Sequence, residues 1–140
     1  MRGFLLDTNV LSELRKGERA HAGVRAWVAA QHADGLFISV LTLAEIRDGI
    51  ERLRPRDPQQ AARLEVWLEE TITHFAARIL PVTPEIADRW GRLSVSAGQP
   101  LPDFDRLIAA TALVHGLDLV TRNIRDFART GVTVVNTWQP

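Results

Sequence analysis

The 140-residue sequence predicts an α/β fold, in which a central, mostly parallel sheet of about five strands is flanked by helices on both faces. Short apolar runs alternate along the chain with longer segments whose apolar residues recur at helical spacing, the pattern of a parallel sheet covered on both sides. Hydrophobic residues make up 46% of the chain and charged residues 24%, as in globular proteins. At this length we expect residues 1–140 to form a single domain.

The first strand is expected at Gly3–Leu6, where three apolar residues follow a glycine. A short helix over Asn9–Leu14 should stop near Gly17, because Gly favours helix ends. A second helix is predicted over Ala20–His32, and the apolar run Leu36–Val40 is the second strand.

Two helices are predicted in the middle of the chain. The first runs from about Leu43 to Leu53, with apolar residues at helical spacing on one face. The second follows a break at Arg54–Pro58, with Asp57 as N-cap and Pro58 at the first helical position. Its apolar stripe comprises Ala61, Leu64, Leu68, Ile72 and Phe75.

The last part of the chain continues the alternation. Ile79–Val82 is the third expected strand, Thr83-Pro84 opens a helix that ends near Gly98, and Gln99–Pro102 is a rigid, proline-containing loop. Leu107–Val114 is apolar almost all round, as expected for a buried helix. The fourth and fifth strands are Leu117–Val120 and Val132–Val135.

Three acids stand at comparable junctions: Asp7 ends the first strand, Glu45 follows the second, and Asp105 begins the buried helix. Ligands of open α/β sheets bind outside the carboxyl ends of the strands, so we expect the three to converge there. Like charges disfavour one another's ionised form, and the natural occupant between them is a hard divalent cation such as Mg²⁺. Such a cation can activate a water for phosphodiester hydrolysis.

Each acid also has a structural alternative. Asp7 is a good N-cap for the following helix. Glu45 completes a capping box that begins at Thr42, and only its position after a strand favours a functional role. Of the two acids Asp103 and Asp105, we assign Asp103 the cap or peripheral role and Asp105 the inward one.

Two polar residues follow the fourth strand. Asn123 could supply a neutral oxygen ligand or hold a water, whereas Asp126 is better explained as a helix cap.

Composition excludes several other kinds of site. With no Cys there is no disulfide, thiolate metal site or cysteine nucleophile, and the four histidines lack metal-ligand spacing. The formal net charge is zero, so nothing global indicates nucleic acid. No apolar stretch has the length of a membrane span and the N-terminus does not resemble a secretory signal, so we expect a cytoplasmic protein. The four tryptophans are interpreted as core or oligomer contacts.

With these residues assembled, nearly the whole chain resembles the PIN-domain ribonucleases, specifically the VapC/FitB-like toxins of type II toxin–antitoxin systems. Four segments in order carry the resemblance: Leu6–Glu13, Ser39–Ile46, Asp105–Ala112 and Val120–Phe127.

The resemblance implies that Asp7, Glu45 and Asp105 bind Mg²⁺ or Mn²⁺ and that the hydroxyl of Thr8 supports the site. The family often has a fourth acid where this chain has Asn123, so Asn123 or Asp126 would complete the site. The implied activity is endonucleolytic hydrolysis of RNA by a metal-activated water. The implied partners are a cognate antitoxin and a second copy of the chain in a homodimer.

Two alternatives stay open. An aspartyl-phosphate phosphatase or receiver domain also places an Asp at a strand end, but these proteins require a nearby lysine, and Lys16 is the only one. The phosphatase pattern also needs a second Asp where Asn9 stands. The other alternative is a non-catalytic module of the same fold that binds nucleic acid or an antitoxin.

Overall fold

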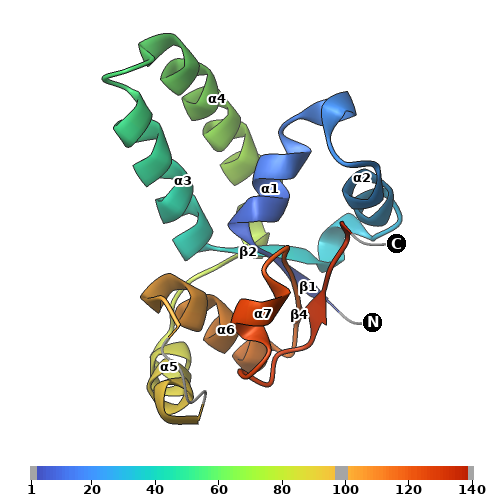
Figure 1. Ribbon diagram of the computed structural model, residues 1–140, viewed down its shortest axis with the longest axis vertical. Coiled ribbons are helices and arrows are strands. Elements are labelled where there is room, and N and C mark those ends of the chain that lie inside the picture. Colours follow the sequence, from blue (N-terminus) through green and yellow to red (C-terminus); the bar gives the residue numbers. More distant parts are fainter. Residues whose placement is uncertain (1–2, 97–100, 139–140) are drawn as a thin grey trace.

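The computed structural model describes residues 3–96 and 101–138, which form a five-stranded sheet with helices on both faces (Figure 1). The strand order is β3-β2-β1-β4-β5, and every strand pairing is parallel. The strands are β1 (Phe4–Leu6), β2 (Leu36–Ser39), β3 (Ile79–Leu80), β4 (Asp118–Val120) and β5 (Val134–Val135). The predicted fold class and the position of all five strands are therefore confirmed, although each strand is shorter than predicted.

Helices connect the strands. The α-helices are α1 (Thr8–Leu14), α2 (Ala22–Ala29), α3 (Val40–Leu53), α4 (Pro58–Phe75), α5 (Pro84–Ser96), α6 (Asp103–His115) and α7 (Ile124–Phe127). Short 3₁₀ turns lie at η1 (Gly17–Arg19), η2 (Ala33–Gly35) and η3 (Ala76–Arg78). The predicted end of the fifth helix near Gly98 and half of the predicted proline loop lie outside the described residues.

Helix boundaries follow local capping. Asp57 caps α4 through a 3.1 Å hydrogen bond from Gln60 N, with Pro58 at the first helical position as predicted. Gly116 ends α6 in the left-handed conformation, at a φ of 64° that favours glycine. The chain can therefore turn directly from α6 into β4.

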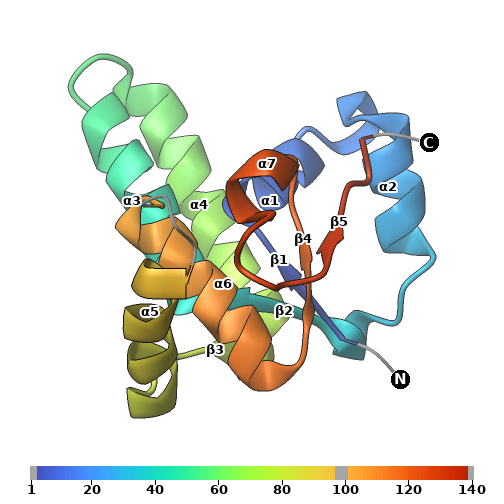
Figure 2. The ribbon, with the colours of Figure 1, turned by 60° about the horizontal axis from the view of Figure 1, so that its bottom comes forward.

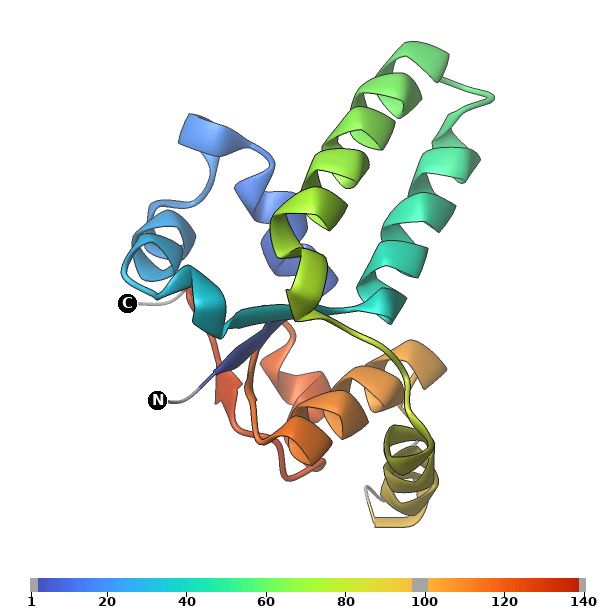
Figure 3. The ribbon, with the colours of Figure 1, turned by 180° about the vertical axis from the view of Figure 1, so that it is seen from behind.

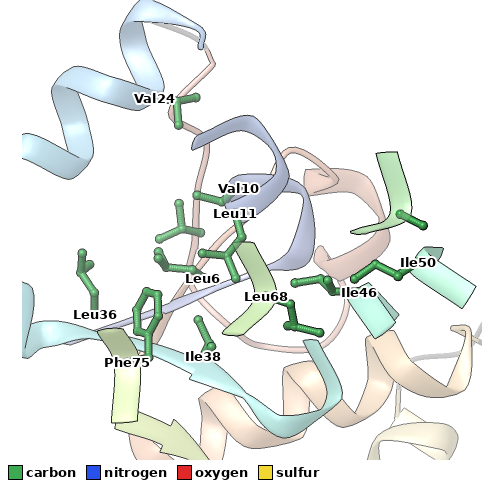
Figure 4. Packing of buried hydrophobic residues seen from close by; sticks show 12 residues of the cluster. Leu6, Val10, Leu11, Val24, Leu36, Ile38, Ile46, Ile50, Leu68 and Phe75 are labelled. Carbon is green, nitrogen blue, oxygen red and sulfur yellow. The ribbon is translucent and has the colours of Figure 1, made fainter. Parts of the chain in front are cut away.

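The sheet divides the core into two layers. Successive residues of a strand point to opposite faces: Leu6 and Val120 pack against α1–α4, whereas Leu5 and Leu119 pack against α5–α7. Figure 4 shows the first layer, and Figure 2 shows α5 beside α6 in the second. The α3–α4 pair projects from the sheet as a helical hairpin (Figure 3).

One part of the predicted helix faces is wrong. Ile72 was placed on the apolar stripe of α4, but its side chain is 41% exposed. Ile72 lies at the edge of the stripe, and its neighbour Thr71 is buried in its place; Ala61, Leu68 and Phe75 are buried as predicted. No helix among the described residues is both long and apolar enough to cross a membrane.

Candidate active site

The carboxyl edge of the sheet carries a cleft of about 460 Å³. Asp7 follows the end of β1, Glu45 lies in α3 directly after β2, and Asp105 lies in the first turn of α6. All three acids line this cleft, together with Thr8 and Asn123. The structure thus brings together five of the six predicted site residues.

Asp7 is buried and held by three hydrogen bonds. Its Oδ1 accepts from the backbone N–H of Thr8 at 2.9 Å, which makes Asp7 the N-cap of α1. Its Oδ2 accepts from the Thr121 hydroxyl at 2.9 Å and from Asn9 Nδ2 at 3.4 Å. Capping and a functional position are therefore combined in one side chain. Burial raises the pKa of Asp7, and the bonds from Thr121 and Thr8 oppose that rise.

Glu45 faces the cleft instead of closing a capping box. Helix α3 begins at Val40 with Ser39 as N-cap, and the Ser39 hydroxyl accepts from Leu41 N at 3.0 Å. Thr42 is a buried residue inside the helix, so the predicted capping box is wrong. The Thr8 hydroxyl donates to Glu45 Oε1 at 2.8 Å, which fixes the carboxylate beside α1. Partial burial, and then repulsion by Asp7, raise the pKa of Glu45.

Asp105 is the most perturbed of the three acids. Burial, followed by repulsion from Asp7, Glu45 and Asp126, raises its pKa to about 6. Its carboxylate accepts no hydrogen bond from any residue that the structure describes. An acid surrounded by like charge and without donors favours protonation or a cation.

Asp103 lies outside the cleft, as predicted for a peripheral residue, but it does not cap α6. The N-cap position is occupied by Pro102, and no side chain caps the helix. Asp103 is instead exposed and pairs with Arg106 at 2.7 Å.

Asp126 does not have the predicted capping role either. The N-cap of α7 is Asn123, whose side chain makes no capping bond, and Asp126 lies inside the helix. Asp126 is exposed and does not line the cleft, although its charge contributes to the raised pKa of Asp7 and Asp105.

Of the three residues that bond to the Asp7 side chain, Thr8 was predicted to support the site, whereas Thr121 and Asn9 were not. Thr121 follows β4 as Asp7 follows β1, so its position at a strand end was an available signal. Its hydroxyl also accepts from Asn9 Nδ2 at 3.2 Å and from Asn123 N at 3.1 Å. Asn9 Oδ1 in turn accepts from the backbone N–H of Arg122 at 3.2 Å. Together these bonds join the loop after β4 to the first turn of α1.

The donor set fits a hard divalent cation. Carboxylate, hydroxyl and amide oxygens are the ligands that Mg²⁺ prefers, and Mg²⁺ keeps several waters when bound. Within residues 3–96 and 101–138, however, no three acidic or histidine side chains are near enough to hold a metal directly. The predicted tight convergence is therefore not seen. Mutual repulsion, with Thr8 holding Glu45 and Thr121 holding Asp7, accounts for an open arrangement that waters can bridge.

The only lysine also lines the cleft, which bears on the phosphatase alternative. Lys16 Nζ lies 3.0 Å from Glu13 Oε1, so its charge is engaged by a neighbouring acid. Asn9 is committed to supporting Asp7 and Thr121. Neither residue is arranged as a partner for an aspartyl phosphate.

A second cavity, of about 770 Å³, opens at the opposite edge of the sheet. Its lining includes Gly3, Gly35 and Leu117, which directly precede β1, β2 and β4. It contains none of the three acids. The carboxyl edge, where the acids meet, is therefore the stronger candidate for a reaction site.

The sequence and the fold match known proteins. The PIN domain model matches residues 4–132. The VapC ribonuclease Y4jK of Sinorhizobium fredii is 34% identical over 140 residues, covering 98% of this chain and 99% of the relative.

Two solved structures share the fold at significant identity. The crystal structure of FitAcB from Neisseria gonorrhoeae aligns with a TM-score of 0.88 and 32% identity, covering 98% of this chain and 99% of the other. A toxin–antitoxin complex from Klebsiella pneumoniae aligns with a TM-score of 0.70 and 29% identity, covering 99% and 100% of the two chains.

Proposed function

This chain belongs to the PIN-domain family, and from that premise we propose that it is a Mg²⁺-dependent endoribonuclease and the toxin of a type II toxin–antitoxin pair. The observation that carries the proposal is the meeting of Asp7, Glu45 and Asp105, from three separate elements, in one cleft at the carboxyl edge of the sheet. The ribonuclease name of its relative in S. fredii supports the same activity.

Asp7, Glu45 and Asp105 would hold the cation partly through bridging waters, because no three acidic or histidine side chains of the described residues lie close enough to ligate it together. Asn123 would act as a neutral oxygen ligand or water holder. A bound divalent cation supplies an activated water and neutralises charge on the scissile phosphate. The chain's own residues prepare the site. Thr121 and the Thr8 amide keep Asp7 in one orientation, and the Thr8 hydroxyl keeps Glu45 directed at the cleft. Fixed ligands reduce the reorganisation that metal and substrate binding require.

The partner proposed for this chain is a protein antitoxin. Support comes from the toxin–antitoxin complex of K. pneumoniae, which shares the fold over the full chain. We further propose that the protein is a homodimer and that it acts on RNA in the cytoplasm. Light scattering after gel filtration would measure the oligomeric state directly.

Asp7→Asn tests the activity. The substitution keeps the shape of the side chain but removes the charge. The single amide oxygen can still accept from the Thr8 N–H, while the NH₂ group replaces Oδ2 beside the Thr121 hydroxyl, which can accept from it. We expect cleavage of a 5′-labelled single-stranded RNA in Mg²⁺ to fall by about 100-fold or more, and the wild type to lose activity in EDTA. Circular dichroism should show an unchanged fold.

Asp103→Asn is the matched control, because Asp103 is an exposed acid at the start of the same helix as Asp105. It should cleave at the wild-type rate. Wild-type activity in Asp7→Asn would contradict the metal-ligand assignment. RNA or antitoxin binding by a wild type that never cleaves would favour the non-catalytic alternative.

A further inference from the structure

One wall of the acidic cleft is formed by an arginine stacked on a tryptophan. The guanidinium of Arg122 lies over the indole ring of Trp138, 5.6 Å from its centroid, and both residues line the cleft that contains Asp7, Glu45 and Asp105. The pair comes from the loop after β4 and from the turn after β5. A planar cation over an aromatic face is attracted to the ring, and this attraction is stronger when the pair is partly removed from water.

The backbone on both sides of this pair is fixed. Arg122 N donates to Asn9 Oδ1 at 3.2 Å, and Asn9 also donates to Asp7, so the arginine is two hydrogen bonds from the acid. Trp138 N donates to Asn136 Oδ1 at 3.0 Å, and part of its ring packs against the core layer of α1–α4. The bond to Asn9 places the backbone of Arg122 beside Asp7, and the packing of Trp138 against the core layer places its ring next to the arginine.

Among the residues that the structure describes, Arg122 has no negative partner of its own. Of the other cations that line the cleft, Lys16 is paired with Glu13, and Arg15 lies over the ring of Trp67, which is outside the cleft lining. On the α3–α4 hairpin, Arg47 and Arg54 are both paired with Glu51 and Glu65. Arg122 is exposed and forms no ion pair with any residue in the described part of the chain. An unpaired guanidinium beside a catalytic cleft is suited to an external anion, because its donors match the oxygens of a phosphate.

We propose that Arg122 and Trp138 form the nucleotide-binding wall of the cleft: Arg122 binds a phosphate next to the scissile one, and the exposed part of Trp138 stacks with a neighbouring base of the RNA strand. This inference rests on the proposed ribonuclease function. Single-stranded RNA is recognised by cationic contacts to its backbone together with base stacking on aromatic side chains and Arg planes, and this wall presents both groups side by side.

An acidic protein segment fits the same wall less well. A carboxylate brought to Arg122 would have to approach the acids Asp7, Glu45 and Asp105, and like charge in this cleft already raises the pKa of Glu45 and of Asp105. A phosphodiester meets the same like charges, but a nucleotide strand also brings bases that can stack on the exposed part of the indole, which a carboxylate side chain does not.

Binding can be measured without cleavage in the Asp7→Asn background. The probe is a 5′-fluorescein-labelled, single-stranded RNA 20-mer of mixed sequence, followed by anisotropy with Mg²⁺ present over a range of salt concentrations. We expect Arg122→Ala to weaken binding about tenfold and to reduce the salt slope by about 0.7, the value of one phosphate contact to a single strand. Trp138→Leu should weaken binding about tenfold at an unchanged salt slope, and Trp138→Phe should recover part of it.

Arg56→Ala is the matched control, since it removes the same charge from an exposed residue in the turn between α3 and α4. It should bind as the parent does. The single variants Arg122→Ala and Trp138→Leu, with Asp7 intact, should raise the KM for RNA cleavage more than they lower kcat. Thermal melts identify any variant that has lost its fold. If Trp138→Leu is unfolded, the contribution of stacking is tested with Trp138→Phe instead.

The outcomes separate the two proposals. If the wild type cleaves RNA but both variants bind it like Arg56→Ala, the wall is overturned and the ribonuclease stands. If no cleavage is found but RNA binding depends on Arg122 and Trp138, the wall stands and the ribonuclease fails. The proposed nucleotide-binding role of the wall is also contradicted if the Asp7→Asn parent binds no RNA. It is contradicted as well if Arg122→Ala and Trp138→Leu keep their affinity for RNA but lose binding to a co-expressed antitoxin.

Discussion

The hydroxyl of Thr121 donates a 2.9 Å hydrogen bond to Oδ2 of Asp7, across 114 positions of sequence. Both residues follow the ends of adjacent strands, since β1 and β4 pair in register. The hydroxyl also accepts from Asn9 and from the Asn123 amide. The Thr121 hydroxyl thus connects the loop after β4 to Asp7 after β1. Removing this oxygen breaks the hydrogen bonds to both Asp7 and the loop.

Thr121→Val removes this oxygen and keeps the side-chain shape. The pKa of Asp7 should rise further, because the Thr121 bond opposes the effect of burial. We expect kcat/KM for RNA cleavage at pH 7 to fall about tenfold. In the pH profile of kcat/KM, the fall on the acid side should move to higher pH. Unfolding in urea at pH 7.5 should show a loss of about 1–2 kcal/mol, typical of a buried charged acceptor that loses a donor.

Thr111→Val is the control for that variant. Thr111 is equally buried in α6, but its hydroxyl donates to the Leu107 carbonyl at 2.7 Å, within its own helix. That carbonyl remains in the helical ladder, so the change should leave the pH profile unaltered. A shift of similar size in both variants would show that the effect is general packing and not the bond to Asp7.

The strands and their alternation could be predicted because they depend on local residue order. Leu5 and Leu6 face opposite layers as period-two packing requires, and the same is true of Leu119 and Val120. The start of α3 was missed because Val40 and Leu41 continue an apolar run that looks like strand. Only the hydroxyl of Ser39, which caps the helix, ends the strand there.

The acids and Thr8 could be located from sequence, and Thr121 stands at a strand end as Asp7 does, but the hydrogen bonds that hold the acids could not be predicted. Asp7, Glu45 and Asp105 were identified by their position at strand and helix ends, and topology brings those ends to one edge. The bonds of Thr121 and Asn9 join residues that are 112 and 114 positions apart. The stacking of Arg122 on Trp138 depends on how two loops meet. Such contacts follow from the packed fold and have no local sequence pattern.

Asp105→Asn should stabilise the metal-free protein at neutral pH. Because the folded-state pKa of Asp105 is raised to about 6, from an ordinary value of 3.8, its contribution to stability is fully present below about pH 4 and is lost as the pH rises through 6. In EDTA at pH 7.5 the variant should gain about 1 kcal/mol, a reduced value because the side chain is partly exposed and solvent screens the repulsion. That corresponds to about 3 °C in Tm.

The same melts at pH 4 provide the internal control. There Asp105 is protonated in the wild type, so the two proteins should have nearly the same Tm. Equal stabilisation at both pH values would mean that repulsion among the acids is not the cause.

Added Mn²⁺ should reverse the order of stability at pH 7.5. A ligand that binds only the folded state raises Tm by an amount that grows with the logarithm of its concentration relative to Kd, and metal binding displaces protons from its ligands. We expect the wild type to gain several degrees in saturating Mn²⁺, with Asp105→Asn and Asp7→Asn gaining little. The apparent affinity of the wild type, measured by calorimetry, should weaken from pH 7.5 to pH 5.5 as Asp105 becomes protonated. An equal gain in all three proteins would place the metal elsewhere.

Variants of Asn123 and Asp126 can show which of the two residues completes the metal site beside the three acids. Asn123 lines the cleft, whereas Asp126 is exposed outside it and acts through its charge. We therefore expect Asn123→Ala to weaken Mn²⁺ binding at pH 7.5 more than Asp126→Ala does. Asn123→Asp should tighten binding by about tenfold, because it adds a carboxylate where the family often has one. In metal-free protein the added charge should raise the pKa of Asp105 further and lower Tm. If only Asp126→Ala weakens Mn²⁺ binding, Asp126 is the residue that completes the metal site, and Asn123 serves only as the N-cap of α7.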